Sequence, residues 1–325
     1  MKAAVIERQG GLENIVYRDW PDPTPGPADV VVRVRACGLN HLDIFVRRGM
    51  PGFPVPMPFI SGGDIAGEIA ALGSAVGTWR VGDRVIVNPQ TDAGMIGEEI
   101  LGGFAELVRV PAKNLLQLPA PIGFATGAAI PINYGTAQRM LTTHGRIQAG
   151  ESILIVGASG GVGVACLQIA KLHGLHTIAV AGSAEKCARL KTLGADATID
   201  MGAGDFGRAA WALTGKQGVD VVVNNTGGDT WVPSLRTLKR GGRIITCGAT
   251  AGYDPKEDLR FIWVRELKVL GSNSYTQDDI ATALAAVAAG KLEPAVTERL
   301  PLARLAEAEA MMEARAFFGK IVLEP

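Results

Sequence analysis

The most informative part of the chain is Glu151–Gly174, which reads ESILIVGASGGVGVACLQIAKLHG. Its first residues, 152–156, are mostly Ile, Leu and Val, a composition typical of a buried parallel strand. A glycine-rich turn follows at 157–163, and apolar residues then recur at helical spacing until Gly174, where a helix would end. The stretch therefore predicts a strand, a glycine turn and a helix in succession.

The glycine turn is suited to bind a pyrophosphate. Glycines let the backbone come close to the phosphates, and the start of the following helix offers free N–H groups and a partial positive charge. The spacing Gly157-x-x-Gly160-x-x-Gly163 is weak when taken alone, because a packing turn between a strand and a helix can look the same. The flanking strand and helix favour the binding site. The expected dinucleotide contacts are Gly157, Ser159, Gly160, Gly161, Val162 and Gly163.

Five further strand-like runs follow the turn, at 176–181, 197–200, 219–224, 243–247 and 268–271. Strands that alternate with helices predict an α/β fold with a doubly wound parallel sheet and right-handed crossovers. Such a sheet binds its ligand over the carboxyl ends of the strands. The further candidates in the loops at those ends are Gly182, Ser183, Lys186, Asn225, Thr226, Cys247, Gly248, Ala249, Ser272 and Asn273.

Composition limits the classes of function. The chain has 325 residues, 47% of them hydrophobic, which is enough for a core and for two domains. Lys plus Arg equal Asp plus Glu at 32 each, so no overall charge indicates nucleic acid or membrane as a partner. We expect a small-molecule substrate and, from the start MKAAVIERQGG, a cytoplasmic location. The four cysteines form no C-x-x-C pair, which is typical of free thiols in a reducing compartment.

The remaining chain divides into two kinds of structure. Residues 1–118 hold many short strands punctuated by Pro and Gly, a pattern that favours a distorted barrel. Beyond 271, the pattern predicts helices at 278–289 and 305–314 and a last strand at 318–323. That last strand is expected to return to the first domain.

Motifs spread over nearly the whole chain carry a family resemblance. Besides the glycine turn, they are RACGLNHLD at 35–43, GGDIAG at 62–67, VGDRV at 81–85, GFAE at 103–106, LGAD at 193–196 and GKIVL at 319–323. The chain resembles medium-chain dehydrogenases/reductases, and it is most similar to their zinc-free quinone oxidoreductase-like branch. The resemblance implies a GroES-like distorted β-barrel catalytic domain at 1–121 and 272–325. It also implies a Rossmann NADP-binding domain at 122–271, with the active site in the cleft between the domains.

The resemblance also bears on metals. Many relatives are zinc alcohol dehydrogenases, with a thiolate at the position of Asn40, a histidine at that of Gly63 and a cysteine or acid near Ile132. Asn, Gly and Ile provide no such site, and segment 88–102 lacks the four close cysteines of the family's structural zinc lobe. We therefore expect no metal. Without a Lewis acid, the easier reaction is hydride transfer to an already polarised alkene or quinone.

The cofactor preference is predicted from the end of the second strand. An NAD site usually has an acid there that binds the ribose 2′-hydroxyl. Residues 180–184 contain no carboxylate, whereas Ser183 and Lys186 resemble the residues that hold the 2′-phosphate in NADPH-using relatives. Glu185 lies at the start of the next helix, where an acid is favoured by the helix dipole. The sequence favours NADPH.

The candidate catalytic residues are Asn40, His41 and Asp64. The resemblance places Asn40 and Thr136 beside the nicotinamide, where Asn40 either orients the cofactor ribose or hydrogen-bonds a substrate carbonyl. His41 is a candidate proton donor or a partly exposed loop histidine. Asp64 replaces the family's usual Glu and is either catalytic or structural. Lys320, in the GKIVL motif, is a candidate cofactor ligand.

Some expectations concern the surroundings of Asn40. Asp43 is expected to order the 38–48 loop by hydrogen bonds. Arg47 and Arg48 are either solvated or meet a substrate phosphate such as that of coenzyme A. The pocket walls are expected from 44–60, 88–102 and 250–265.

The sequence thus favours a zinc-independent oxidoreductase that transfers hydride from NADPH to a quinone or an α,β-unsaturated carbonyl, either an enone or an enoyl thioester. Two alternatives remain, an alcohol dehydrogenase-type carbonyl reductase with an unrecognised metal site and a non-catalytic NADPH-binding protein. Because the family usually dimerises through the last strand of its sheet, here about 267–273, a homodimer is expected.

Overall fold

A computed structural model describes residues 1–50 and 54–325, which form two compact units. The first unit comprises Met1–Ile132, Thr276–Ala288 and Pro294–Pro325, and the second comprises Asn133–Tyr275 and Ala289–Glu293. Residues 122–132 therefore lie in the first unit, whereas they were expected in the nucleotide-binding domain. Residues 272–275 and 289–293 lie in the second.

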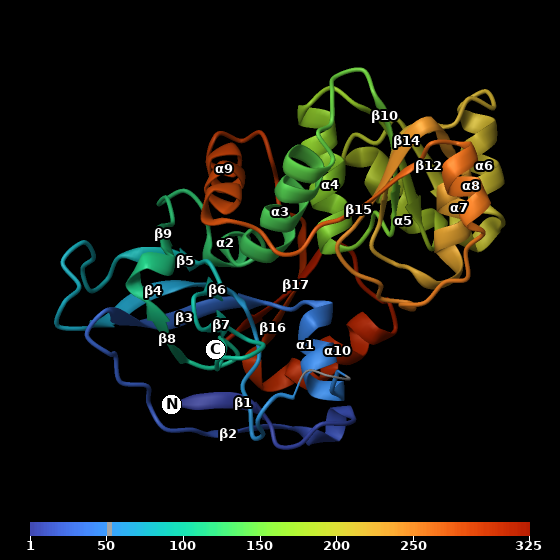
Figure 1. Cartoon of the computed structure of the whole chain (residues 1–325). Helices are drawn as coiled ribbons and strands as arrows, with labels where there is room; N and C mark the ends of the chain where they lie inside the picture. Colours follow the sequence, from blue (N-terminus) through green and yellow to red (C-terminus); the bar gives the residue numbers. More distant parts are fainter. Residues whose placement is uncertain (51–53) are drawn as a thin grey trace. The chain divides into compact units, whose positions relative to one another are not determined.

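The second unit contains strands β10, β12, β14 and β15 among others (Figure 1). They belong to a six-stranded parallel sheet with the order β12-β11-β10-β13-β14-β15. The strands are β10 (Ser152–Val156), β11 (His176–Ala181), β12 (Ala197–Asp200), β13 (Val219–Asn224), β14 (Leu238–Thr246) and β15 (Lys268–Gly271). The strand order reverses between β10 and β13, as in a doubly wound sheet. Only β14 departs clearly from expectation, because it begins at Leu238 rather than at Arg243.

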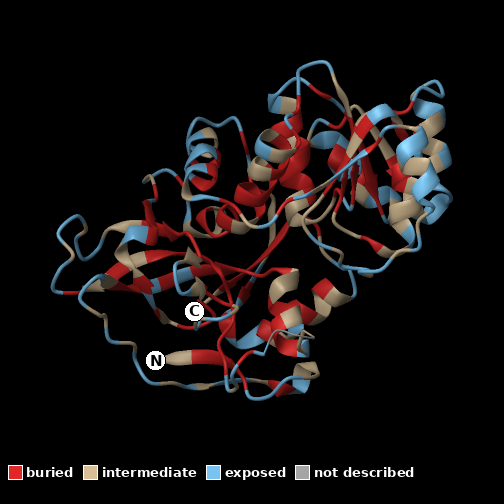
Figure 2. Ribbon diagram, viewed as in Figure 1, coloured by how far each residue is buried: buried red, intermediate tan, exposed pale blue. Residues whose placement is uncertain are grey.

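Helices connect these strands, and they are α4 (Gly161–Leu172), α5 (Ala184–Thr192), α6 (Phe206–Leu213), α7 (Trp231–Arg236) and α8 (Leu259–Val264). Right-handed crossovers place α4 and α5 on one face of the sheet and α6, α7 and α8 on the other. Gly174 follows the end of α4 with φ +76°, as expected for a residue that ends a helix. The sheet is the buried centre of the unit (Figure 2). Leu154 and Val222 on its central strands have no exposed surface.

Before this sheet, α3 (Pro131–Gln138) continues into a π-helical turn, η3 (Arg139–His144). Short 3-10 turns in the same unit are η4 (Met201–Ala203) and η5 (Gly228–Thr230).

The first unit holds a seven-stranded, mostly antiparallel sheet with the order β16-β17-β3-β4-β5-β9, in which β8 also pairs with β3. Its strands are β3 (Asp29–Gly38), β4 (Asp64–Leu72), β5 (Arg84–Val87), β8 (Leu107–Pro111), β9 (Leu115–Gln117), β16 (Val296–Pro301) and β17 (Lys320–Glu324). Two smaller hairpins pair β1 (Lys2–Ile6) with β2 (Ile15–Asp19), and β6 (Gln90–Thr91) with β7 (Gly94–Met95). The last strand returns to this unit as expected, because β17 pairs with β3.

The helices of the first unit are α1 (His41–Arg48), α2 (Phe124–Gly127), α9 (Gln277–Ala288) and α10 (Leu305–Glu313), with 3-10 turns η1 (Leu12–Asn14), η2 (Ala112–Asn114) and η6 (Leu302–Arg304). The expectation of a loop at 38–48 was wrong, because most of this segment is α1. Across the described residues, no helix combines the length and apolar character needed to cross a membrane.

Candidate active site

The glycine turn follows β10 and begins α4, as the sequence predicts. Gly157 has φ +72°, a conformation that glycine adopts without strain, and Gly160 is the N-cap of α4. A Cβ atom at Gly163 would lie 2.4 Å from the carbonyl oxygen of Gly157, so packing requires glycine there. A Cβ atom at Gly160 would have no neighbour nearer than 3.7 Å. The turn is therefore tightly packed at Gly163 and open at Gly160, the N-cap of the helix.

The other candidate loops also follow the carboxyl ends of the strands. They hold Ser159, Gly161 and Val162 after β10, Gly182, Ser183 and Lys186 after β11, Asn225 and Thr226 after β13, Cys247, Gly248 and Ala249 after β14, and Ser272 and Asn273 after β15. Since the sheet is parallel, these residues share one edge. At Gly182 and Gly248 an added Cβ would meet nothing within 4 Å. The edge thus offers open backbone at several points, which suits a long dinucleotide.

Hydrogen bonds join the loops at this edge, but the hydroxyl of Ser272 has no partner among the described residues. Asn225 Oδ1 accepts the Cys247 N–H at 3.0 Å, which joins the loops after β13 and β14. The Ser272 N–H donates to the Thr246 carbonyl at 2.9 Å. The Ser272 hydroxyl is buried, and among the described residues it has no hydrogen-bond partner. A buried hydroxyl without a partner is costly, so this one fits a site completed by a polar ligand.

The residues at the end of β11 are those expected to contact the adenosine ribose of the cofactor. Ser183 is the N-cap of α5, and its hydroxyl accepts the Lys186 N–H at 3.3 Å. Asp200 ends the neighbouring strand β12 opposite Ala181, and its carboxylate accepts the Gly202 N–H at 2.8 Å. Asp200 was not among the expected ribose ligands, because the acid of an NAD site is ordinarily at the end of the second strand and Asp200 ends the third.

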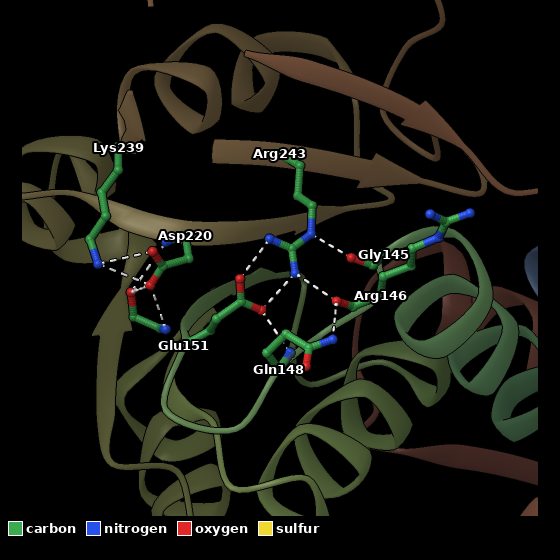
Figure 3. Close-up of polar contacts among 8 residues, drawn as sticks. Gly145, Arg146, Gln148, Glu151, Asp220, Lys239 and Arg243 are labelled. Carbon is green, nitrogen blue, oxygen red and sulfur yellow. Dashed lines mark hydrogen bonds and ion pairs between the residues drawn. The ribbon is translucent and has the colours of Figure 1, made fainter. Parts of the chain in front are cut away.

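The opposite, amino edge of the sheet is closed by ion pairs (Figure 3). Arg243 binds both carboxylate oxygens of Glu151, at 2.8 and 2.6 Å, and Lys239 lies 2.9 Å from Asp220. Burial opposes ionisation of both carboxyls, but their cationic partners and backbone N–H groups hold both pKa values below the ordinary range. The charges of Glu151 and Asp220 at the amino edge are therefore compensated within the protein. The candidate binding residues remain those at the carboxyl edge.

In the first unit, the structure brings together Asn40, Asp64 and Lys320. Lys320 Nζ donates to Asn40 Oδ1 at 2.7 Å and to Asp64 Oδ2 at 2.5 Å. Asn40 Nδ2 donates to Asp64 Oδ2 at 2.9 Å, and Asp64 Oδ1 accepts the Ile132 N–H at 2.7 Å. The exposed fractions are 8%, 0% and 2% for Asn40, Asp64 and Lys320. These three residues are called the buried triad below.

Asp43 fixes the segment that carries Asn40. Its carboxylate accepts the N–H of Asn40 and the N–H of Gly62, both at 2.8 Å, so it joins the start of α1 to the loop before β4. The expectation that Asp43 orders its surroundings by hydrogen bonds is confirmed. Burial raises the pKa of this carboxyl to about 8, against the opposing effect of the two N–H donors.

His41 is the first residue of α1 and is partly buried. Burial, followed by the nearby charges of Arg315 and Lys320, lowers the pKa of its imidazole to about 4. The ring is therefore neutral at pH 7 and does not carry the extra proton of an imidazolium donor. Thr136 lies on α3 in the second unit and is also buried.

The surroundings of Arg47 differ from the expectation. This residue is only 1% exposed, and its guanidinium binds Glu309 and Glu313 of α10 and the carbonyl oxygen of Gly10. Arg48 also pairs with Glu313. The reading of two solvated arginines is therefore wrong for Arg47, whose charge is compensated within the protein. Its two carboxylate partners lie more than 260 positions away in the sequence, so no local pattern could have indicated them.

Comparison with known proteins extends this picture. Residues 26–120 match the family described as an alcohol dehydrogenase GroES-like domain, and residues 161–289 match the family described as a zinc-binding dehydrogenase. Human quinone oxidoreductase is 30% identical, over 99% of this chain and 97% of that protein. Quinone oxidoreductase of Pseudomonas aeruginosa is 32% identical, over 97% of each. The chain belongs to the medium-chain dehydrogenase/reductase superfamily.

Within that superfamily the chain is quinone oxidoreductase-like, and the expected fold class is confirmed. A solved structure described as an NAD-dependent alcohol dehydrogenase superposes with a TM-score of 0.94 at 36% identity, covering all of both chains. A medium-chain dehydrogenase/reductase with these relatives is an oxidoreductase. The expected pocket walls include residues 51–53, which lie outside the described residues.

The zinc-binding name of one matched family requires a test against this chain. Of the three positions at which the resemblance expects zinc ligands, Asn40 carries an amide that is already bonded, and Gly63 and Ile132 carry no donor. A Cβ at Gly63 would lie 2.9 Å from the Ile96 carbonyl oxygen, which leaves little room for a longer side chain. Within 1–50 and 54–325, no group of three or more His, Cys, Asp or Glu could hold a metal ion. These residues do not fit a zinc site.

Proposed function

We propose that the protein is a zinc-independent oxidoreductase that transfers hydride from NADPH to a quinone or to an α,β-unsaturated carbonyl, an enone or an enoyl thioester. The observation that carries the zinc-independent part is the buried triad. Asp64 pairs with the ammonium of Lys320 at 2.5 Å, so the carboxylate is already neutralised by a cation of the chain itself. A divalent metal ion placed there would be repelled by that ammonium.

The cofactor part of the proposal rests on the carboxyl edge of the second unit. Its open glycines, the start of α4 and the unpaired Ser272 hydroxyl would hold the dinucleotide. The bound nicotinamide supplies the hydride. The residues proposed to contact it are the loop residues at that edge, together with Thr136, Asn40 and Lys320.

The acceptor must be polarised already if no metal ion assists at its oxygen. Hydride added to the β-carbon of an enone or enoyl thioester leaves an enolate, and hydride added to a quinone leaves a hydroquinone anion. Each product takes up one proton afterwards. Because His41 is neutral at pH 7, we assign that proton to water.

NADPH is proposed over NADH because the end of β11 carries Ser183 and Lys186 and no carboxylate. Asp200, on the neighbouring strand, is the observation that favours NADH, since a carboxylate repels a 2′-phosphate and accepts bonds from ribose hydroxyls. The two cofactors must therefore be compared directly.

A second candidate is an alcohol dehydrogenase-type carbonyl reductase. The 36% identical structure described as an NAD-dependent alcohol dehydrogenase favours it. It would use simple ketones or aldehydes, whereas the first proposal predicts little turnover with them.

The test is to measure oxidation of NADPH and NADH with quinones, enones, enoyl-CoA thioesters, and simple ketones and aldehydes. The proposal expects turnover with at least one electrophilic alkene or quinone, at a higher kcat/KM with NADPH. Turnover confined to simple carbonyls would favour the second candidate. Binding of NADPH without turnover of any acceptor would instead favour a non-catalytic NADPH-binding protein.

We also propose a cytoplasmic homodimer. Within the described residues, the edge strand β15 pairs only with β14, and its Val269 is 46% exposed. On α8, which precedes β15, Leu259, Trp263 and Val264 are 62–64% exposed. A free strand edge beside exposed apolar side chains supports pairing with a second copy of the chain.

A further inference from the structure

A cavity of about 320 Å³ lies at the amino edge of the six-stranded sheet, opposite the edge that carries the glycine turn. Its walls come from the first residues of β10, β11 and β12, the turn after α6 and the start of β14, all in the second unit. Ligand pockets have volumes of about 300–1,000 Å³, so this cavity has room for a small organic molecule. The lining residues used below are Ser152, His176, Ile178, Leu213, Gln217 and Lys239.

Part of the lining is apolar. Ile178 of β11 is 1% exposed, whereas Leu213, the last residue of α6, is 54% exposed. An apolar ligand body in contact with both residues would remove the leucine side chain from water, which is favourable. The cavity therefore suits a molecule that is apolar over part of its surface.

The rest of the lining retains free hydrogen-bond donors. Among the described residues, Lys239 Nζ bonds only to Asp220, at 3.0 and 2.9 Å (Figure 3). An ammonium carries three N–H groups, so at least one remains for a ligand. Gln217 is exposed, and its side-chain amide has no partner in the part of the chain that the structure describes. The side chain of His176 is 61% exposed, and its ring carries an N–H in either tautomer.

The charged and backbone acceptors near the cavity are already engaged. Asp220 Oδ2 accepts the backbone N–H and the hydroxyl of Ser152, at 2.8 and 2.7 Å, in addition to its bond from Lys239. Glu151 is bound at both oxygens by Arg243. Carbonyls in the last turn of α6 accept N–H groups of the turn that follows. A ligand therefore finds its strongest polar partner in the ammonium of Lys239.

The charges around the cavity also favour an anion. Lys171 Nζ binds both carboxylate oxygens of Asp196, at 2.8 and 3.0 Å, and Lys191 Nζ donates to the backbone carbonyl of Asp196 at 2.5 Å. Lys239 pairs with Asp220. Three ammonium groups thus lie beside two carboxylates. One further negative charge would balance this group.

We infer that this cavity is a second binding site, which takes a small monocarboxylate with an apolar body. The carboxylate accepts N–H groups of Lys239 and Gln217, and the apolar part covers Ile178 and Leu213. A monoanion is favoured over a phosphate dianion because Asp220 lies beside the single lining ammonium, and the described lining residues include no arginine. The site lies within the second unit and does not depend on the proposed function.

The test follows binding by NMR spectroscopy of the deuterated, ¹⁵N-labelled full chain. The probes are hexanoate, the neutral hexanamide, and acetate, which lacks the apolar body. Hexanoate should shift the backbone amide signals of Ala197 and Gly218, which line the cavity, and the shifts should saturate. Hexanamide should bind at least about fivefold more weakly because it lacks the charge. Acetate should bind at least about tenfold more weakly because it buries less apolar surface.

Variants then connect this binding to the lining. Lys239→Met should weaken hexanoate binding about tenfold or more, because the ligand would face the unpaired carboxylate of Asp220. Gln217→Glu changes an exposed side chain and should weaken hexanoate about fivefold by repulsion, with hexanamide binding unchanged. The control is Lys291→Met, which removes an exposed ammonium that is not part of the cavity lining in the same unit. It should leave hexanoate binding unchanged.

Three results would overturn the inference. The first is that hexanoate causes no saturable shift at Ala197 and Gly218, or shifts only signals of the glycine turn. The second is that hexanamide binds as tightly as hexanoate. Neither result requires a variant to fold. The third is unchanged hexanoate affinity in Gln217→Glu, a substitution on the surface that decides the question even if Lys239→Met does not fold.

Discussion

At the scale of single residues, Lys320 is the charge on which the zinc-independent proposal depends. It is 2% exposed and makes its ion pair with a carboxylate that is 0% exposed. A buried pair of this kind contributes little net stability compared with apolar groups, but removal of one partner leaves the other charge buried and uncompensated.

Lys320→Met should therefore lower the free energy of unfolding by about 3–5 kcal/mol, measured by urea denaturation at neutral pH. Lys320→Met combined with Asp64→Asn should recover most of that loss, because no unpaired charge remains. Arg299→Met, which breaks the exposed Arg299–Glu324 pair of the same unit, is the control and should cost at most about 1 kcal/mol. An equally small effect of Lys320→Met would contradict a buried charge at this position.

His41 predicts a pH dependence of stability. The pKa of its imidazole is about 4 in the folded protein and ordinarily 6.5, so the unfolded chain takes up the proton first as the pH falls. The wild type should lose at most about 3 kcal/mol from this group between pH 6.5 and pH 4. His41→Gln should lose less over the same range in urea unfolding, and His173→Gln controls for the loss of an exposed histidine. Parallel curves for the wild type and His41→Gln would contradict the lowered pKa.

The individual residues show where sequence reasoning ends. Asn40 and Asp64 were identified through motifs, but their bonds to Lys320 join positions separated by 280 and 256 residues. Burial of Arg47 against α10 was missed for the same reason. A side chain's type can be read locally, whereas its partner and its protonation depend on which distant segments fold beside it.

At the scale of elements, two glycines of the turn have different roles. Gly163 is required for packing, and Gly160 leaves room for a ligand. A Cβ at Gly163 would meet the Gly157 carbonyl oxygen at 2.4 Å, whereas a Cβ at Gly160 would have free space. Gly160 also has φ −83° and ψ 171°, which any residue can adopt.

Substitution at these two glycines should have opposite effects. Gly163→Ala should lower the free energy of unfolding by about 1–3 kcal/mol through overpacking. Gly160→Ala should change stability by less than about 1 kcal/mol but weaken NADPH binding about tenfold or more, because its methyl group fills the place of the pyrophosphate. Urea denaturation and fluorescence titration measure the two quantities. A Gly160→Ala variant with unchanged NADPH affinity would show that the turn does not bind the dinucleotide.

The elements of the second unit were predictable because the strands of a parallel sheet are continuous apolar runs. Five of the six strand ranges in its sheet match the expectation, from Ser152–Val156 to Lys268–Gly271. In the first unit, α1 was taken for a loop and β16 was not anticipated. The sequence of β16, VTERLP, has a mixed polar character, and the strand is recognisable only through its pairing with β17.

At the scale of the whole molecule, the edge of the six-stranded sheet predicts self-association. The wild type should elute as a species of twice the chain mass of 34.0 kDa in size-exclusion chromatography with light scattering. Val269→Asp should shift the population towards monomer, because it places a charge on the exposed edge strand. Val81→Asp alters a 64% exposed valine of the first unit and should leave the dimer intact. A monomeric wild type at micromolar concentration would contradict the proposal.

The most direct test of the central claim is a measurement of metal content together with turnover. The protein would be purified without added metal, analysed by mass spectrometry for bound metals, and assayed for NADPH oxidation by its best quinone or enone before and after exhaustive treatment with a strong zinc chelator. We predict far less than one metal ion per chain and an unchanged kcat after treatment. Stoichiometric zinc, with activity that is lost on chelation and restored by added zinc, would contradict hydride transfer without a metal ion.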